Sequence, residues 1–551
     1  MNELQPEPST PPVATTTPAE EPGWGGVRLA VALLSAVVIL AAVGLFVRNA
    51  ANDLPWVNHD VAYLSLAASE ILGGDRLYVD FDEVNPPGVF FLLAGQLAVA
   101  RAIGLPDILP GHLFVLALGA CGLIVLWRSL RRPDDDLSFV LVALAYLLVL
   151  VRGNFANNVV PAESGIPYDF GQREHLFAVV FLPYLVWRLR SARASVWGYL
   201  GLMMLGYVAS FKPYWAVMVG AVELWRLFRD DRRAPGVYVA LLVGWGLPFL
   251  ILLVHSPAAF AAFAWDVLPQ MVGGIYAYYE LTPAQFAITG FHLRMMLGGA
   301  VFGALWLRCF SDRLVERSAL GLLLIVEAIA YGSFVHQGKF WSYHAMVFFG
   351  TTVVSAAVLA AAVANGPLRR WGRAAIAVVG SVLLAVAVGG SLVQLHRMLD
   401  LHLPKGAALV PLLRGERNVM VLSTAGDYAY APLVLGLRTV GPWGEHYRVA
   451  PLLTLQDPKR RRAEVEDYAA KIARRIAADT PEVLVFAPYR HGLPPGDSLH
   501  DILVSHGALP DGIYRRLPQA LLEDRHPALA GWIVYTRIES SDPGRKHQEG
   551  V

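Results

Sequence analysis

The sequence predicts a polytopic α-helical membrane protein with one small α/β domain after its last membrane span. Of 551 residues, 55% are hydrophobic and only 16% are charged, whereas soluble domains have nearer a quarter charged residues. About eleven apolar segments come close to the roughly 20 residues that a helix needs to cross a bilayer. Residues 399–540 differ, because short β-type runs there alternate with helical stretches.

The two ends of the chain are predicted to be disordered tails. Residues 1–24 are dominated by Pro, Thr and Glu and cannot form a core. They also lack the basic start of a signal peptide, so we expect the first apolar segment to stay as an uncleaved helix. Residues 541–551 are the second expected tail.

The expected membrane module covers residues 25–398. Its predicted spans lie near residues 27–48, 110–128, 137–152, 175–190, 196–210, 213–228, 236–254, 288–307, 318–335, 344–363 and 374–396.

Arginine placement predicts the orientation of these spans. Each connection that follows an even-numbered span holds three or four arginines, whereas the longer connections between them hold only scattered cations. Positive residues gather on the cytoplasmic side of membrane proteins. We therefore expect a cytoplasmic amino terminus, with the long loops and the carboxyl-terminal domain outside a bacterial inner (plasma) membrane. The arginines are Arg128, Arg131 and Arg132; Arg188, Arg190 and Arg193; Arg226, Arg229, Arg232 and Arg233; Arg308, Arg313 and Arg317; and Arg369, Arg370 and Arg373.

Residues 49–109 are predicted to form a first outer loop of interfacial helices. The apolar stretch 88–104 is short, and a crossing there would invert every later connection. It follows Pro86-Pro87, and proline suits the first turn of a helix. Residues 60–72 form another expected helix, with Asp60 where an N-cap would lie and Gly73-Gly74 at its end.

The domain at residues 399–540 is predicted to be α/β. Residues 419–423, 482–487 and 532–538 have strand composition, and residues 457–478 form an amphipathic helix pattern with a proline near its start. No Walker loop or G-x-G-x-x-G is present, so nothing supports nucleotide binding. A net charge of +1 argues against a nucleic-acid partner.

Polar residues gather at the outer ends of the predicted helices, in the loops and before spans four, six and ten. Together they suit transfer from a lipid-linked sugar phosphate. Cations would hold the phosphate, and a carboxylate would take a proton from an acceptor hydroxyl. The set comprises His59, Tyr63, Asp80, Asp82 and Glu83 beside Asp60; Glu163, Asp169, Gln172, Arg173, Glu174 and His175; Lys212; and His336, Lys339, Tyr343 and His344.

The first outer loop also resembles a known family. The run Asp60-x-x-Tyr63, followed by Gly73-Gly74, Tyr78, Asp80 and Pro86-Pro87-Gly88, is similar to that loop in GT-C glycosyltransferases. These include protein O-mannosyltransferases and the bacterial enzyme that adds aminoarabinose to lipid A. The resemblance implies an inverting transferase with a polyprenyl-phosphate sugar donor and a lipid, polysaccharide or protein acceptor.

The resemblance also implies roles for single residues. It makes Asp60 the general base, and Glu174, or alternatively Asp169, the second acid. Lys339 would hold the donor phosphate. The other donor-binding candidates are Arg173, Lys212, Tyr343 and His344. The lipid A enzyme has a lysine before its proline-containing helix where this chain has Asn85, so Arg173 or Lys212 would have to supply that charge.

Simpler interpretations of the same residues stay open. Asp60 could only cap a helix, Glu174 and Arg173 could form a surface ion pair, and Lys339 could extend to the interface. Glu327, near the middle of span nine, fits a transporter or flippase of lipid-linked glycans. A non-catalytic scaffold for envelope assembly is the third possibility. The histidines lack the close spacing of a zinc site, so no metal or other cofactor is expected.

Overall fold

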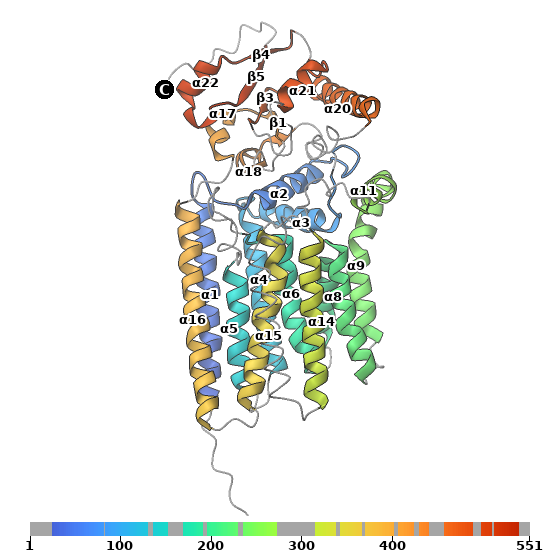
Figure 1. The fold of residues 1–551 in the computed structure, drawn as a ribbon. Coiled ribbons are helices and arrows are strands. Elements are labelled where there is room, and N and C mark those ends of the chain that lie inside the picture. The colour runs from blue at the N-terminus through green and yellow to red at the C-terminus, as the bar shows by residue number, and fades with distance from the viewer. Residues whose placement is uncertain are drawn as a thin grey trace, which may run out of the picture.

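The computed structural model consists of a helix bundle with a small sheet domain at one end, which we call the sheet end (Figure 1). Helices lying across the bundle separate the two parts. The structure describes residues 25–81, 83–130, 136–152, 169–190, 195–229, 235–272, 314–337, 342–365, 370–401, 406–423, 429–439, 457–488, 498–509 and 512–538.

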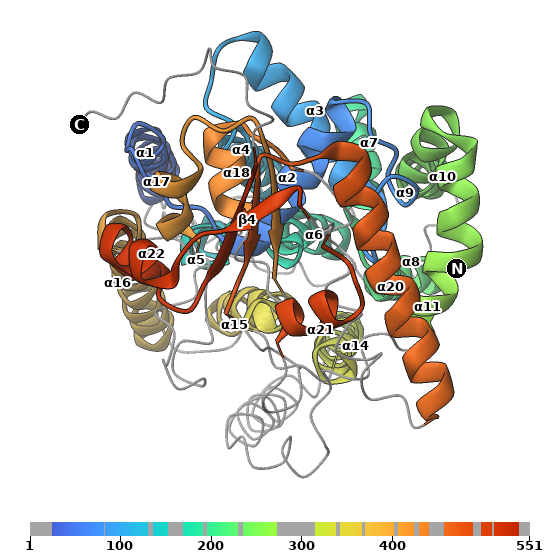
Figure 2. The ribbon, with the colours of Figure 1, turned by 90° about the horizontal axis from the view of Figure 1, so that it is seen from above.

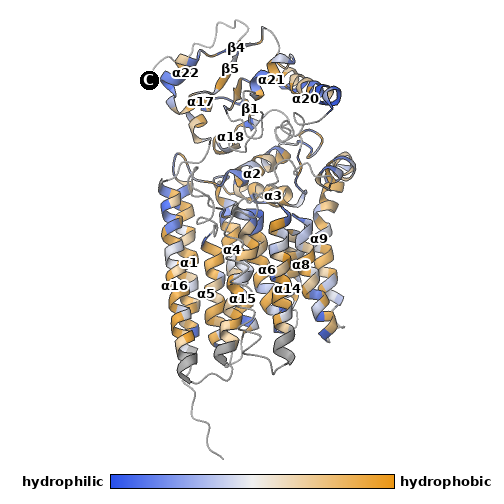
Figure 3. Ribbon diagram, viewed as in Figure 1, coloured by the Kyte–Doolittle hydropathy of each residue, from blue (hydrophilic) through white to orange (hydrophobic). Residues whose placement is uncertain are grey.

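The bundle confirms the predicted polytopic helical class. Every expected span except 288–307, which lies outside the described residues, coincides with a helix. Six described helices are by themselves long and apolar enough to cross a membrane, and apolar residues dominate the bundle (Figure 3). The bundle helices are α1 (Gly25–Ala50), α4 (Leu109–Ser129), α5 (Asp136–Arg152), α6 (Arg173–Leu189), α7 (Val196–Ala209), α8 (Pro213–Arg229), α9 (Pro235–His255), α14 (Leu314–His336), α15 (Met346–Asn365) and α16 (Arg370–Leu401).

Two features hold the bundle together. Helix α5 lies at its centre, with every residue from Leu137 to Val151 buried, and it contacts α1, α4, α6, α15 and α16. Helices α7 and α9 approach each other through glycines. A Cβ on Gly206 would lie 2.2 Å from the Leu241 carbonyl oxygen, and one on Gly244 would lie 2.0 Å from that of Met203. Only glycine allows backbones to come this close.

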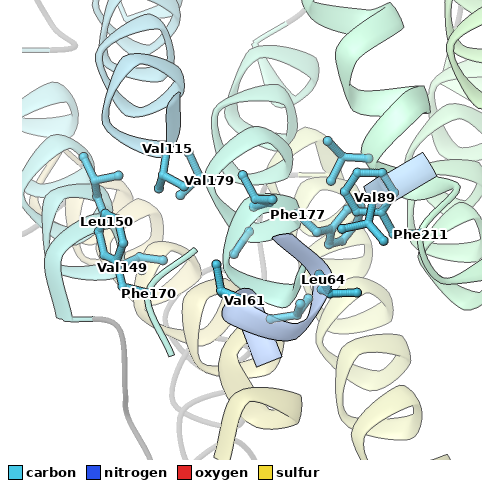
Figure 4. Packing of buried hydrophobic residues seen from close by; sticks show 14 of the residues in the cluster. Val61, Leu64, Val89, Val115, Val149, Leu150, Phe170, Phe177, Val179 and Phe211 are labelled. Carbon is cyan, nitrogen blue, oxygen red and sulfur yellow. The ribbon is translucent and has the colours of Figure 1, made fainter. Parts of the chain in front are cut away.

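Helices α2 (His59–Leu72) and α3 (Gly88–Ala102) lie across the sheet end of the bundle rather than alongside its helices (Figure 1). With 15 residues, α3 is short for a span, and it contacts α2, α4, α7 and α9. Val61 and Leu64 of α2 pack toward Phe177 of α6 in the apolar core (Figure 4). This packing fixes the start of α2 against the start of α6. Three short helices follow α9: α10 (Pro257–Ala262), the π-helix η2 (Phe263–Val267) and α11 (Leu268–Val272).

The sheet domain has five strands in the order β2-β1-β3-β5-β4. Strands β1, β2 and β3 are mutually parallel, whereas β5 is antiparallel to both β3 and β4. The predicted strands coincide with β1, β3 and β5, and the predicted amphipathic helix with α20. The strands are β1 (Asn418–Leu422), β2 (Arg438–Thr439), β3 (Val483–Phe486), β4 (Tyr514–Arg516) and β5 (Ile533–Arg537). The helices are η4 (Ser342–Ala345) before α15, then η5 (Ala407–Leu409), α17 (Val410–Leu413), α18 (Tyr430–Leu435), α20 (Pro458–Asp479), α21 (Leu499–Ser505), α22 (Gln519–Arg525) and η7 (Pro527–Leu529).

The sheet domain covers the sheet end of the bundle (Figures 1 and 2) and is fastened to the α2 region by buried hydrogen bonds. A Glu70 carboxylate oxygen accepts from the Thr439 backbone N–H at 2.9 Å and from its hydroxyl at 2.6 Å. The Tyr430 hydroxyl donates to the Pro55 carbonyl oxygen at 2.8 Å. The helix that carries Asp60 is therefore held from both sides.

Candidate active site

Asp60 lies in the first turn of α2, but it does not cap the helix. The N-cap is Asn58, whose side-chain oxygen accepts from the N–H groups of Asp60 at 2.9 Å and Val61 at 3.3 Å. The expectation that Asp60 occupies the cap position is therefore wrong. Because a neighbouring amide does the capping, the Asp60 carboxylate is available for other contacts.

Two side chains hold the Asp60 carboxylate. Gln172 donates from Nε2 to Asp60 Oδ2 at 2.9 Å and to Asn58 Oδ1 at 2.8 Å. His59 Nε2 lies 3.3 Å from Oδ1, and the Asp60 side chain is 20% exposed. Burial by itself would raise the pKa of Asp60, but His59, the Gln172 hydrogen bond, Arg173 and Lys212 together bring it below its usual value. The carboxylate is thus ionised at neutral pH and open on one side.

The start of α6 supplies the wall opposite Asp60. Gly171 has a φ of +82°, a conformation that favours glycine, and it lets the chain turn into the helix. The Gly171 N–H donates to His175 Nδ1 at 3.1 Å, and the His175 ring packs edge-on against Phe170. His175 is fully buried, so its ring shapes this turn.

A buried ion pair lies beside this wall. Lys212, in the turn between α7 and α8, donates to Glu174 in the first turn of α6 and, at 2.8 Å, to Gln337 Oε1 after α14. The side chains are 12% and 1% exposed for Lys212 and Glu174. Burial lowers the pKa of Lys212 to about 8, although Glu174 opposes this change. The Lys212 Nζ also lies 5.7 Å from the centre of the Tyr343 ring.

Arg173 brings a second cation to the same wall. Its guanidinium donates to the side-chain oxygen of Asn85, directly before Pro86. Asn85 is fixed in turn by Glu83, whose Oε1 accepts from the Asn85 backbone N–H at 2.9 Å and side-chain amide at 2.7 Å. Glu83 also accepts from the Tyr63 hydroxyl, and burial raises its pKa. Glu83 and Tyr63 therefore shape the loop that positions Asn85 and Arg173.

The structure thus brings part of the predicted set together around Asp60: His59, Arg173, Glu174, Lys212 and Tyr343. Asp169 is buried, and its carbonyl oxygen accepts from the Gln172 N–H at 3.1 Å. His344 is buried against the Tyr343 ring. Asp80 points elsewhere, because Arg76 binds both of its carboxylate oxygens. Lys339, Asp82 and Glu163 lie outside the described residues.

Sequence reasoning did not single out Asn58 or Gln337, and it gave Gln172 no role. Asn58 could have been found, since an Asn followed by helix-forming residues is an N-cap signal. Nothing in the sequence places Gln172 or Gln337 against residues more than a hundred positions away. Among the described residues, no group of three His, Cys, Asp or Glu side chains is arranged to hold a metal ion.

Neither a protein-family model nor a curated protein sequence matches the chain. Solved structures do. The crystal structure of ArnT from Cupriavidus metallidurans bound to undecaprenyl phosphate matches with a TM-score of 0.53 and 15% sequence identity, covering 94% of this chain and 98% of that one. The chain has the ArnT fold. The apo structure of the same ArnT aligns with a TM-score of 0.41 and 17% identity over 85% of this chain and 93% of that one.

The ArnT fold agrees with the resemblance to GT-C enzymes seen in the first loop, which is thereby confirmed at the level of the fold. At 15% identity the likeness does not extend to the chemistry. The residues around Asp60 therefore carry the evidence for an activity.

Proposed function

We propose that this chain is an inverting glycosyltransferase that moves a sugar from a polyprenyl-phosphate donor to an acceptor hydroxyl at the outer face of a bacterial plasma membrane. The observation that carries this proposal is the ionised, partly open carboxylate of Asp60 beside the cations Arg173 and Lys212. The fold supports it, since ArnT in the solved complex binds undecaprenyl phosphate.

Asp60 would act as the general base. It is held by Gln172 and His59 and keeps its negative charge at neutral pH, so it can accept the proton of an acceptor hydroxyl. The hydroxyl oxygen then forms a bond to the anomeric carbon as the bond between that carbon and the phosphate oxygen breaks. A single displacement of this kind inverts the anomeric configuration, in agreement with the family resemblance.

Arg173 and Lys212 would stabilise the departing phosphate. Negative charge grows on the bridging oxygen as the bond breaks, and fixed cations lower the energy of that state. Glu174 holds the Lys212 ammonium in place, so we assign it a positioning role, with Asp169 as the alternate second acid. We also propose that Lys339 binds the donor phosphate. Tyr343 lies beside Lys212 and His344 packs against Tyr343, and both are proposed to line the donor site.

The proposed orientation places the sheet end outside the cell. The arginine-rich connections follow α4, α6, α8 and α15 in the sequence, and the carboxyl ends of these helices lie at the opposite end of the bundle from α2 (Figure 1). The positive-inside rule puts that end in the cytoplasm. Helices α2 and α3 would then lie at the outer leaflet, with the sheet domain on the outer side of the membrane.

The test is sugar release and transfer by the purified chain in detergent, with a panel of radiolabelled polyprenyl-phosphate monosaccharides. Wild type is compared with Asp60→Asn and with Asp80→Asn, the same chemical change in the same loop at a surface pair with Arg76. We expect wild type and Asp80→Asn to turn over one donor, and Asp60→Asn to lose at least a hundredfold in rate, as removal of a general base does. Full activity in a folded Asp60→Asn variant would refute the assignment.

A further inference from the structure

A small pocket begins next to Asp60. It lies between α2, α3, α4 and the turn into α6, and its lining includes Val61 and Gly171. Val61 follows Asp60 in the chain, and Gly171 precedes the Gln172 that holds it. The pocket and the candidate base therefore share one wall.

The lining of this pocket includes polar atoms without hydrogen-bond partners among the described residues. His112 of α4 is 2% exposed, and its Nε2 atom has no partner. Gln96 of α3 likewise has an unpaired side-chain oxygen. The His112 ring stacks on Phe46 at 4.2 Å between centroids, so its orientation is fixed. Leaving buried polar atoms unpaired costs free energy, so both atoms favour a bound polar group.

The chemistry of these atoms selects a hydroxyl. The Gln96 side-chain oxygen can only accept a hydrogen bond, whereas Nε2 of a neutral histidine accepts or donates according to its tautomer. A hydroxyl has one donor and can also accept, so it donates to the Gln96 oxygen and accepts from Nε2 when that nitrogen carries the ring proton. A phosphate does not suit the pocket, because no Lys or Arg is among its described lining residues, whereas the acid Asp107, which binds Arg101 through both oxygens, is.

The size of the pocket limits what enters. It leaves about 20 Å³ for the centre of a water-sized group, which accommodates one hydroxyl or hydroxymethyl group but not a ring. The surrounding side chains are mostly apolar, including Leu93, Leu97 and Val115. The group that enters would thus be one polar arm of a larger, uncharged molecule.

We propose that this pocket binds a non-reacting hydroxyl of the glycosyl acceptor while the reacting hydroxyl of the same molecule lies at Asp60. This inference rests on the proposed function, and it specifies the acceptor class as a neutral, hydroxyl-bearing molecule. His112 and Gln96 are then acceptor-binding residues, on the other side of the base from Lys212 and Glu174.

Gly111 of α4 allows a direct test. It lines the pocket, and a Cβ added there would lie 3.7 Å from the Gln96 side-chain oxygen, an ordinary contact without a clash. Gly111→Ala therefore occupies the space without straining the fold. The matched control is Gly95→Ala on α3, where an added Cβ meets nothing within 4 Å. His112→Phe keeps the stacking on Phe46 and removes the ring nitrogens.

The probe is n-octyl-β-D-glucoside, a neutral amphiphile with one hydroxymethyl arm. It is titrated calorimetrically into the full chain in an amine-oxide detergent that carries no hydroxyls. We expect saturable binding to wild type and Gly95→Ala, and affinities about five- to tenfold weaker for Gly111→Ala and His112→Phe, the loss expected for one or two hydrogen bonds. Equal affinities for Gly111→Ala and Gly95→Ala, or no saturable binding to wild type, would overturn the proposal. The pocket would then be interpreted as a site for an ordered water only.

The same variants separate this inference from the proposed function. Wild type could release no sugar from any donor and still bind the glucoside, with a weaker affinity in Gly111→Ala. That result would contradict the transferase proposal and support the hydroxyl site. If wild type transfers sugar and Gly111→Ala changes neither the glucoside affinity nor the acceptor KM, the pocket assignment is wrong and the transferase proposal is supported.

Discussion

The buried pair of Lys212 and Glu174 makes a prediction whose size follows from the structure. Lys212→Met removes the ammonium but keeps a side chain of similar length. Glu174 is only 1% exposed, and the substitution removes the hydrogen-bond donor to its Oε1 atom. The other carboxylate oxygen of Glu174 already has no partner among the described residues. Stripping one partner from a buried pair costs about 3–5 kcal/mol, because the remaining charge is neither hydrated nor compensated.

The double variant Lys212→Met/Glu174→Gln should recover most of that loss. A neutral amide has a far smaller cost of burial than a lone carboxylate, so we expect the double variant to be within about 1–2 kcal/mol of wild type. Neither the single nor the double variant should transfer sugar, because both lack the Lys212 cation that we place at the donor phosphate.

Thermal unfolding in detergent at neutral pH, followed by tryptophan fluorescence, measures the stability. A matched control is Arg462→Met on α20, which breaks an exposed pair with side chains 80% and 50% exposed and should change the midpoint little. The buried pair would not have the predicted energy if Lys212→Met had the same unfolding midpoint as the double variant, or if its midpoint were lowered as little as that of Arg462→Met.

Three further predictions address other parts of the structure. Because the pKa of Lys212 is lowered from 10.5 to about 8, the donor Kd should rise as pH increases through 8. The unfolded chain binds more protons at this site between pH 8 and 10.5, so the contribution of Lys212 to stability should rise over the same window. Gly206→Ala should lower the unfolding midpoint well below that of Gly201→Ala in the same helix, since only the first would place a Cβ 2.2 Å from a backbone oxygen; equal midpoints would contradict the close α7–α9 packing. Glu327→Gln should leave transfer intact, as its contacts are with Thr351 and Thr352 away from Asp60, and loss of glycan transport with normal transfer in this variant would favour the transporter alternative.

The sequence predicted the elements with strong periodicity or hydrophobicity. The bundle helices, the helix within residues 88–104, the strands at β1, β3 and β5 and helix α20 all follow patterns several residues long. Strands β2 and β4 were missed because they have two and three residues, too few for an alternating pattern. The cap at Asn58 was missed because Asp60, two residues later, is an equally good cap by residue type.

The site was harder to predict than the fold. The sequence placed Asp60, Arg173, Glu174 and Lys212 at helix ends on one side of the membrane, which made a common cavity plausible. The sequence could not show which of these residues contact one another. The pairing depends on the crossing of α2 over α6, which brings Gln172 to Asn58 and Asp60, and on the end of α14, which brings Gln337 to Lys212. Asp80 and Glu83 are also carboxylic acids of the first loop, but Asp80 binds Arg76 and Glu83 binds Asn85.

The contact between Arg173 and Asn85 bears on the one departure from the lipid A enzyme. A lysine before the proline-containing helix would place a cation at that point of the loop. Here an asparagine occupies the position, and the guanidinium of Arg173 reaches its side-chain oxygen from the start of α6. The charge would thus be supplied by a different element at the same place. The helices α2 and α6 also both begin at this site, and the positive ends of their dipoles add to the two cations. With Asp60 and Glu174 as the acids there, the local balance leaves room for one more anion, and a phosphate leaving group would supply it.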